Sequence, residues 1–485
     1  MVTPEIRWIA IFPELILAVG AAVILLVEVQ WKPRASRLGA IAGFAALLAF
    51  GFTILQWAQA KNAVEVGFTD DLVGFSGMVL TDGFAIFSRF VLISIMALGL
   101  LASWRFVESL GRRAAEALAL VLLATTGFSI MVASNNLVMM FLGLEVGSIA
   151  LYVLAGMTRD KTRSDEAAMK YFLLGSFASA IFIYGVALLY AGTGQFEILA
   201  MRGFFQGVIV TAPAVILIGM GLVIVGLGFK VSAAPFHTWA PDVYQGAPAG
   251  ITGYMAAMAK IAGFAAIGRI LITGLPQFDQ NWMPVLAGIA AASMVIGSVV
   301  ALVQQDIRRL LAYSGIAHAG FIMTGVVGGA TTGMLFYVTV YAIQLVGAFA
   351  IVSSVSGSDS SASDLDEYRG LAKRSPALAV SFAVLLLGMA GLPLTSGFVA
   401  KFGVFTEAWA GGYSWLVIMG VLMSVVAFAF YMRVIVVMFI DEAEGDQVVV
   451  SATVRWAVGI AAVATVLIGI VPGPLLRMAA NAFPL

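Results

Sequence analysis

The sequence predicts an all-α polytopic membrane protein with about fourteen transmembrane helices. Of its 485 residues, 61% are hydrophobic and only 11% are charged, whereas a soluble globular protein carries about 25% charged residues. Apolar stretches of roughly 18–25 residues, each long enough to cross a bilayer, recur along the whole chain. Basic residues gather in alternate connections, a pattern that orients membrane helices. We therefore expect one helical bundle in a membrane.

The apolar stretches give the predicted helices in order. Charged residues and Gly- or Pro-containing turns set their boundaries. The first stretch is expected to remain as a helix and not to be a cleaved signal, because it lacks a basic start and contains Pro13 and Glu14. The helices are expected over residues 8–30, 37–58, 81–104, 115–133, 135–157, 166–191, 211–230, 248–274, 284–304, 307–328, 332–355, 376–409, 412–440 and 453–476.

Basic residues follow the first, third, fifth, ninth and eleventh of these helices. The connections on the opposite side hold little beyond Lys61 and Arg202. Because loops rich in Lys and Arg stay in the cytoplasm, the odd-numbered connections are expected there and both termini on the opposite side. The residues that carry this pattern are Lys32, Arg34, Arg37, Arg105, Arg112, Arg113, Arg159, Lys161, Arg163, Arg308, Arg309, Arg369, Lys373 and Arg374.

Two of the predicted helices contain residues that interrupt a helix. After Lys230 the chain continues as VSAAPFHTWAPDVYQGAPAG, and GLPLTSGFVAKF places Gly391 and Pro393 shortly before Lys401. Broken helices at matching places in two halves are typical of inverted-repeat transporters. We expect N-terminal helices over 1–114, one five-helix repeat over 115–274, a second, inverted repeat over 284–440 and a last helix within 441–485.

Four charged residues lie deep inside the apolar stretches: Glu145, Lys230, Lys260 and Lys401. Each costs roughly 2.5–3.5 kcal/mol at the centre of a membrane helix, and together they cost on the order of 10 kcal/mol. That sum is comparable to the stability of a whole domain. We expect these groups to move charge inside the membrane, and protons in particular.

A pair formed by Glu145 and Lys230 would suit this task. At about 5 Å and an effective dielectric constant of about 20, their attraction is about 3 kcal/mol, so movement of one partner changes how firmly the other holds its proton. Simpler alternatives stay open. Glu145 could be a neutral side chain that joins two helices, Lys230 could extend to the interface, and Lys401 could cap the carbonyls freed by the broken helix.

Four further residues are weaker candidates. His237 lies in the first interruption, and His318 follows Tyr313 in YSGIAHAGF. Histidine relays protons near neutral pH, although a lone His in a membrane often only joins helices. Lys170 either modulates the Glu145 pair or extends to the cytoplasmic interface.

Near other helix ends, the polar residues Asp82, Arg89, Tyr431 and Arg433 are expected to be interface anchors.

Composition excludes several kinds of function. The chain has no Cys and two His, so thiolate metal sites and cysteine-bound iron–sulfur clusters are excluded, and a haem or a carboxylate metal site is not expected. We expect no metal and no bound cofactor. The formal net charge is zero, which does not favour nucleic acid as a partner.

Several strings resemble those of the antiporter-like subunits of proton-pumping NADH–quinone oxidoreductase, respiratory complex I. They are FKVSAAPFHTWAPDVYQGAP with the helix of Lys260, QQDIRRLLAYSGIAHAGF, and the Gly-Pro interruption before Lys401. FLGLEVGSIALYVLAG and KYFLLGSFASAIFIYGVALLYAGTG are most similar to subunit N. The resemblance covers nearly the whole chain. A Lys at position 401 fits subunit N better than subunit M, and no long lateral helix follows as in subunit L.

The resemblance implies fourteen helices, two inverted repeats and one proton channel that contains Glu145, Lys230, Lys260 and Lys401. It places His237, Tyr313 and His318 on a central polar axis. It also implies a bacterial inner membrane with periplasmic termini, subunits M, K and L and lipids as partners, and FMN, iron–sulfur clusters and the quinone site in other subunits.

The chain departs from the family at both interruptions, with GAPAGIT for the usual GAPTPVT and LPLTSGF for PPLAGF or similar. These changes affect the backbone near the interruptions but keep the titratable residues. Two other functions stay open. One is a subunit of a multi-subunit cation/proton antiporter, and the other is a structural spacer.

Overall fold

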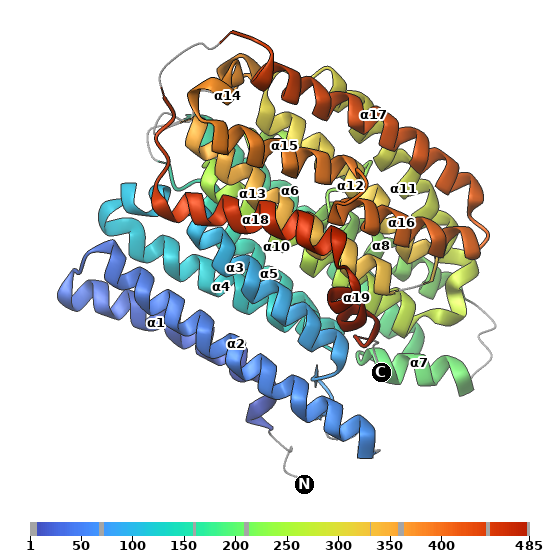
Figure 1. Cartoon of the computed structure of the whole chain (residues 1–485). Helices are drawn as coiled ribbons and strands as arrows, with labels where there is room; N and C mark the ends of the chain where they lie inside the picture. The colour runs from blue at the N-terminus through green and yellow to red at the C-terminus, as the bar shows by residue number, and fades with distance from the viewer. Residues whose placement is uncertain are drawn as a thin grey trace.

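Long helices make up most of the chain in a computed structural model (Figure 1), which describes residues 7–66, 72–158, 162–207, 213–329, 331–356, 363–442 and 447–482. Twelve of the described helices are long and apolar enough to cross a membrane. Ala214–Lys230 and Pro376–Ala390 are shorter apolar helices. The predicted all-α membrane architecture is confirmed. Arg159 and Lys161, used above to orient the chain, lie outside the described residues.

The first third of the chain forms helices and a small hairpin at one end of the bundle. Asp82 begins α3 by accepting a hydrogen bond from the Ala85 N–H at 2.9 Å, the usual task of an N-cap aspartate. The sequence did not predict the hairpin, whose strands have two residues each. The elements are η1(Trp8–Ile11), α1(Phe12–Trp31), α2(Ala35–Val66), β1(Val73–Gly74), β2(Val79–Leu80) and α3(Gly83–Ser109).

The next part contains the first interrupted helix. The chain leaves helical geometry after Lys230 and resumes it at Trp239, as the Pro-rich sequence predicts. Asn136 caps α5, and the short helix α7 was not predicted. The elements are η3(Gly111–Arg113), α4(Ala114–Ala133), α5(Leu137–Ala155), α6(Thr162–Thr193), α7(Ile198–Gly207), α8(Ala214–Lys230), α9(Trp239–Gly246), α10(Ala249–Ile267) and the π-helical turn η4(Gly268–Gly274).

The last part contains the second interrupted helix, which breaks between Ala390 and Ser396. The helix predicted over 453–476 ends at Ile470, because Pro472 starts a separate helix, α19. The elements are η5(Pro276–Phe278), α11(Asp279–Leu302), α12(Ile307–Val327), α13(Thr331–Val355), η6(Leu365–Tyr368), α14(Leu371–Arg374), α15(Pro376–Ala390), α16(Ser396–Ala410), α17(Ser414–Phe439), α18(Ala452–Ile470) and α19(Gly473–Ala480).

The centre of the bundle is formed by α10, α12 and α13. Every residue of α10 is buried, whereas α17 and α18 expose large apolar side chains such as Val425 and Val463. A helix that is apolar on all sides and fully buried belongs inside a large bundle. The exposed apolar faces of the outer helices are expected for a protein whose solvent is lipid.

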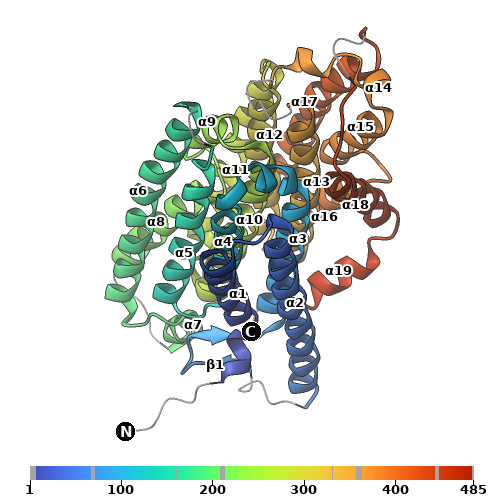
Figure 2. The same cartoon turned by 90° about the vertical axis from the view of Figure 1, so that its left-hand side faces the viewer.

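The two ends of the bundle differ in what they carry. In Figure 2 the long helices run roughly upright, with α9 and α14 at the upper end and β1 and α7 at the lower end. Gly74 lies against Ala10, and Gly83 lies against the backbone of Asn481. Both ends of the described chain therefore lie at the lower end, where we predicted the two termini to lie together.

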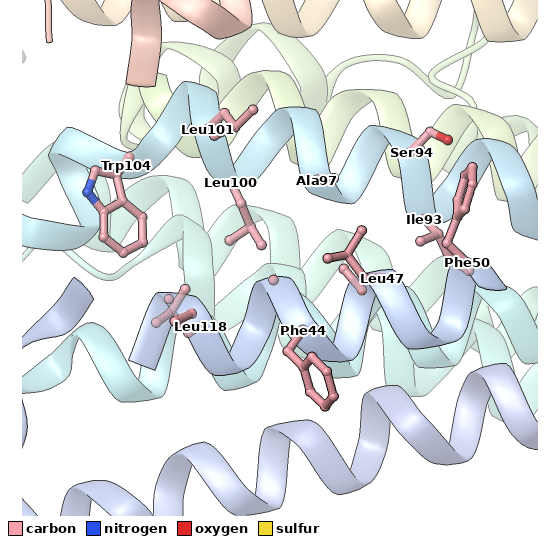
Figure 3. Close-up of a pocket in the computed structure, with 14 residues that line it drawn as sticks. Phe44, Leu47, Phe50, Ile93, Ser94, Ala97, Leu100, Leu101, Trp104 and Leu118 are labelled. Carbon is pink, nitrogen blue, oxygen red and sulfur yellow. The ribbon is translucent and has the colours of Figure 1, made fainter. Parts of the chain in front are cut away.

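An apolar groove of about 770 Å³ lies between α2 and α3 (Figure 3). Only one of its lining residues, Ser94, has a polar side-chain oxygen. A groove of this composition fits the lipid-facing side of a membrane protein. Its walls include Gly43, Phe44, Leu47, Phe50, Ile93, Ala97, Leu100 and Trp104.

Two residues expected to be interface anchors instead form ion pairs inside the bundle. The Arg89 guanidinium donates to Glu14 at 2.7 Å, and the Arg89 side chain has no exposed surface. Asp82 accepts two hydrogen bonds from Arg269, one of them at 2.8 Å. The anchor prediction is wrong for Arg89 and Asp82, because a buried charge needs a partner and each one finds it on a helix distant in the sequence.

Candidate functional site

A row of titratable side chains crosses the interior of the bundle from α5 to α16. The three lysines Lys230, Lys260 and Lys401 are 4%, 1% and 5% exposed, and His318 is 3% exposed. They come from α8, α10, α16 and α12. Buried ionisable groups must find polar partners or become neutral, so the partners of each one indicate what the row can do.

Lys230 is the last residue of α8, and its ammonium points to α5. The Nζ atom donates to the Ser148 hydroxyl at 2.7 Å and lies 5.0 Å from the centre of the Phe128 ring. Ser148 and Glu145 are three residues apart, so they share a face of α5. Glu145 is close enough to act electrostatically on Lys230, but no ion pair joins these two described residues. The direct partner of the Lys230 ammonium is thus Ser148 and not Glu145, and the coupling of Glu145 with Lys230 stays a prediction.

Glu145 itself is partly buried in α5. Its Oε1 atom is inaccessible to solvent and has no hydrogen-bond partner among the described residues. A buried carboxyl oxygen in this condition is poorly satisfied. This argues against Glu145 as a fully hydrogen-bonded link between two helices.

Lys260 occupies the middle of α10 and reaches the first interruption. Its ammonium donates to the Val231 carbonyl at 2.7 Å. Val231 directly follows the end of α8, where carbonyls have no partner within the helix. Gly263 allows this close approach, since a Cβ there would lie 2.6 Å from the Val231 side chain.

Tyr341 of α13 lies between Lys260 and His318. A Cβ at Gly315 would lie 3.0 Å from the Tyr341 hydroxyl oxygen and 3.9 Å from the Lys260 Nζ, so both polar atoms face the same spot on α12. The Tyr341 ring stacks on the His318 ring with 4.3 Å between centroids. Its buried hydroxyl has no hydrogen-bond partner in the described part of the chain.

His318 is held by two tyrosines. Its Nδ1 lies 3.0 Å from the Tyr337 hydroxyl oxygen and its Nε2 lies 3.2 Å from that of Tyr431. Tyr431 also hydrogen-bonds Ser314. The prediction that Tyr431 is an interface anchor is therefore wrong, because this residue is buried next to the histidine.

Lys401 completes the row at the second interruption. Its ammonium donates to the carbonyl of Ala390, the last residue of α15, at 2.8 Å, and lies 4.5 Å from the centre of the Phe321 ring. Gly391 has a φ of +87°, and a Cβ there would lie 2.9 Å from the Lys401 side chain. Glycine is therefore required at this position on both conformational and steric grounds.

Lys260 and Lys401 make the same kind of contact at the two interruptions. Each donates to a carbonyl freed at the end of a broken helix, where the helix dipole is negative. The contact expected if Lys401 only caps a carbonyl freed by the broken helix is thus present. It does not exclude a functional role, because an ammonium held by one carbonyl can be released to another acceptor.

Three of the predicted residues lie apart from the row. Lys170 forms ion pairs with Glu166 and Asp242, each at 2.7 Å, at the end of the bundle that carries α9. No contact with Glu145 is found for it among the described residues, so the structure gives no support to Lys170 as a modulator of Glu145. His237 lies partly buried in the turns between α8 and α9, and no side-chain hydrogen bond joins it to the row among the described residues.

Tyr313 is partly buried on α12 and has no side-chain hydrogen bond in the described part of the chain. The residues that take its expected place near His318 are Tyr337, Tyr341 and Tyr431. Tyr337 and Tyr341 are four residues apart on α13, a spacing that puts both on one helix face. This spacing is visible in the sequence and could have indicated that the two tyrosines act together. It could not have indicated that His318 is their partner.

A family profile described as "NADH:quinone oxidoreductase/Mrp antiporter, TM" matches residues 134–427, which contain the whole row. "NADH-quinone oxidoreductase subunit N 1" of Solibacter usitatus is 39% identical over 474 residues, 96% of this chain and 95% of that protein. The chain belongs to the subunit N family of NADH-quinone oxidoreductases. Another subunit N, from Mycobacterium tuberculosis, is 46% identical over 389 residues, 78% of this chain and 73% of that protein.

Solved structures of membrane complexes contain chains with the fold of this one. A chain of "Respiratory complex I from Thermus thermophilus with bound Aureothin" has a TM-score of 0.79 and 31% identity, covering 96% of this chain and 99% of that one. A chain of the "Mrp complex from Dietzia sp. DQ12-45-1b" has a TM-score of 0.80, covering 98% of this chain and 96% of that one. At 19% identity, the second shows a shared fold.

Proposed function

We propose that this chain is a membrane-arm subunit of an NADH-quinone oxidoreductase that translocates protons, driven by quinone reduction elsewhere in the complex. The observation that carries the proposal is the buried row itself: three lysines, a histidine and a carboxylate cross the interior between the two interrupted helices. Intramembrane ionisable residues mark proton relays in pumps and transporters.

The proposed path begins at Glu145 and at Lys230, whose ammonium donates to the hydroxyl of Ser148, three residues beyond Glu145 on α5. It continues at Lys260 and passes Tyr341 to His318. Proton transfer between these groups requires their hydrogen bonds to exchange, and hydroxyl groups can both donate and accept. Lys401 is the proposed last carrier of the second half-path.

The carbonyls at the interruptions give the path a physical switch. An ammonium on Lys260 or Lys401 is stabilised by a freed carbonyl, whereas a neutral amine gains less from the same contact. A shift of the broken helix that moves this carbonyl away therefore favours release of the proton. The energy available per contact is about 1.5–3 kcal/mol, the usual worth of a hydrogen bond to a charged group.

We also propose that residues 115–274 and 284–440 are two inverted repeats, preceded by 1–114 and followed by 441–485. Matching contacts support this division. In the first unit α4 packs against α5, and a Cβ at Gly127 would meet the backbone of Gly147. In the second unit α11 packs against α12, and a Cβ at Gly297 would meet the backbone of Ala317.

The proposal extends to the surroundings of the chain. We place it in a bacterial inner membrane with both termini periplasmic, in contact with subunits M and K, the lateral helix of subunit L, and lipids. It acts as part of a translocase and binds no redox cofactor, so that FMN, iron–sulfur clusters and the quinone site lie in other subunits. The cation/proton antiporter reading is less supported, because the similar curated relatives are named as subunit N.

The decisive experiment is Lys260→Ala in the intact complex, with the exposed Lys373→Ala as matched control. We expect assembly to survive, while NADH-driven proton translocation falls by at least about 100-fold, the lower range for loss of a positioned proton-transfer group. Lys373→Ala should behave like the unmodified complex. Full pumping in assembled Lys260→Ala would instead favour the structural spacer.

A further inference from the structure

Glu407 is a partly buried carboxylate that sequence analysis did not single out. It lies on α16, six residues beyond Lys401 and three before the helix ends at Ala410. Its Oε1 atom accepts a hydrogen bond from the Gly333 N–H at 3.0 Å. Its Oε2 atom is inaccessible to solvent and has no hydrogen-bond partner among the described residues. This carboxylate is therefore only half satisfied.

Glycines form the cradle around this carboxylate. A Cβ at Gly333 would lie 2.3 Å from Oε2, and one at Gly325 would lie 3.4 Å from the same atom. A Cβ at Gly328 would lie 2.6 Å from the backbone of Glu407. The end of α12 and the start of α13 thus approach the glutamate so closely that these positions leave no room for a side chain. This close packing fixes the position of the carboxyl group.

A second buried polar group lies beside this cradle. Thr331, the first residue of α13, is 1% exposed, and its hydroxyl has no hydrogen-bond partner in the described ranges. Gly333 is the third residue of the same helix, so both groups belong to one helical turn. The free N–H groups of a helix start favour a negative charge. The start of α13 therefore offsets part of the cost of burying a carboxylate here.

The glutamate lies where the bundle meets water. Trp409 and Trp415 flank the turn between α16 and α17 and are 57% and 48% exposed. Exposed tryptophans mark the membrane–water interface. The start of α13 and the end of α16 lie at the same end of the bundle as the two chain termini, because successive spans alternate in direction.

About 9 Å of helix rise separates Glu407 from Lys401. The intervening surface is apolar: Val404 contacts Gly325, and Phe321 lies under the Lys401 ammonium. Proton transfer between the two groups therefore requires a transient opening of this apolar layer to water. A closed layer prevents protons from leaking back between cycles.

We propose that Glu407 is the proton-release group of the second half-path, accepting the proton that leaves Lys401 and passing it to water at the end of the bundle that carries the termini. This rests on the proposed proton translocation. The simpler role for Glu407 is to cap α13 through Gly333. Glutamine tests the difference, because its amide oxygen retains the cap but takes up no proton at neutral pH.

The experiment compares Glu407→Gln, Glu407→Asp and the control Asp279→Asn in inner-membrane vesicles that contain the whole complex. Asp279 begins α11 at the same end of the bundle, and its side-chain carboxylate accepts a hydrogen bond from the backbone N–H of Gln280. We expect Glu407→Gln to lower NADH-driven proton translocation by at least about 10-fold, a conservative share of what a positioned proton-transfer group contributes. Glu407→Asp should restore part of the loss, and the control should show none.

Pumping by assembled Glu407→Gln at the rate of the unmodified complex overturns the proposal. Equal losses in Glu407→Gln and Glu407→Asp also overturn it, because they indicate a role in packing alone. Lys260→Ala, measured in parallel, separates the two proposals. If Lys260→Ala fails to pump while Glu407→Gln pumps fully, proton translocation stands and only the release group is wrong.

Accessibility provides an independent check. The chain has no Cys, so Glu407→Cys introduces the one thiol of this subunit. We expect a membrane-impermeant methanethiosulfonate added on the side of the termini to label it during turnover, as read by mass spectrometry of this chain. Labelling only from the opposite side, or none during turnover, contradicts the proposed release route.

Discussion

Replacement of Ser148 by alanine tests whether the first half-path depends on the contact seen between α5 and α8. The Lys230 ammonium donates to the Ser148 hydroxyl at 2.7 Å, and both residues are buried. A hydrogen bond to a charged group contributes about 1.5–3 kcal/mol. Loss of this hydrogen bond destabilises the protonated form of Lys230 by the same amount. The equilibrium between the protonated and the neutral lysine then shifts towards the neutral form by a factor of roughly 10–150.

The measurement is NADH-driven proton translocation, followed by quenching of a pH-sensitive dye in vesicles that contain the assembled complex. We expect Ser148→Ala to lower the initial rate about 10-fold or more, at the lower limit of that range. Ser148→Thr keeps the hydroxyl and should retain most of the rate. Ser129→Ala is the matched control, since this buried hydroxyl on α4 has no partner among the described residues.

An unchanged rate in Ser148→Ala would refute the reasoning. It would show that Lys230 exchanges protons without the serine, so that Glu145 acts on it directly during turnover. Equal losses in Ser148→Ala and Ser129→Ala would also refute it, because they would indicate damaged packing of α4 and α5.

Three further changes test other contacts. Tyr431→Phe removes the hydroxyl near Nε2 of His318 and should lower proton translocation several-fold while assembly persists; an unchanged rate would remove Tyr431 from the path. Gly391→Ala places a Cβ 2.9 Å from the Lys401 side chain at a φ of +87° and should destabilise the subunit by about 1–3 kcal/mol, seen as a lower melting temperature of the complex. Asp82→Ala leaves a buried arginine without its carboxylate and should cost about 3–5 kcal/mol; normal yields of assembled complex would contradict this.

The positions of the helices follow closely from the sequence, and so do both interruptions. The stretches predicted over 115–133, 307–328 and 332–355 agree with α4, α12 and α13 to within a residue. This agreement arises because each span must be apolar over a fixed length and must end where polar groups meet water. Elements that the sequence did not predict include α7, α19 and the hairpin of β1 and β2, which lie outside the twelve long apolar helices. There no membrane constraint acts, and short segments depend on local packing.

The identities of the buried lysines were also predictable, because charge in an apolar stretch is conspicuous. Their partners were not. Lys260 binds a carbonyl 29 residues away in the chain, and no pattern in α10 indicates that contact. Glu407 was overlooked because it lies near the end of its helix, where a carboxylate ordinarily meets solvent. The close approach of Gly325 and Gly333 covers its Oε2 atom.

The sequence by itself determined that the chain crosses a membrane many times, where its two broken helices lie and that Lys230, Lys260 and Lys401 are buried, since each of these depends on polarity along one segment. The tertiary structure alone decided which groups meet. Lys230 meets Ser148, and tyrosines surround His318, because helix packing brings together side chains from distant segments. Contacts of this kind depend on three-dimensional distances of a few ångströms, which separation along the chain does not specify.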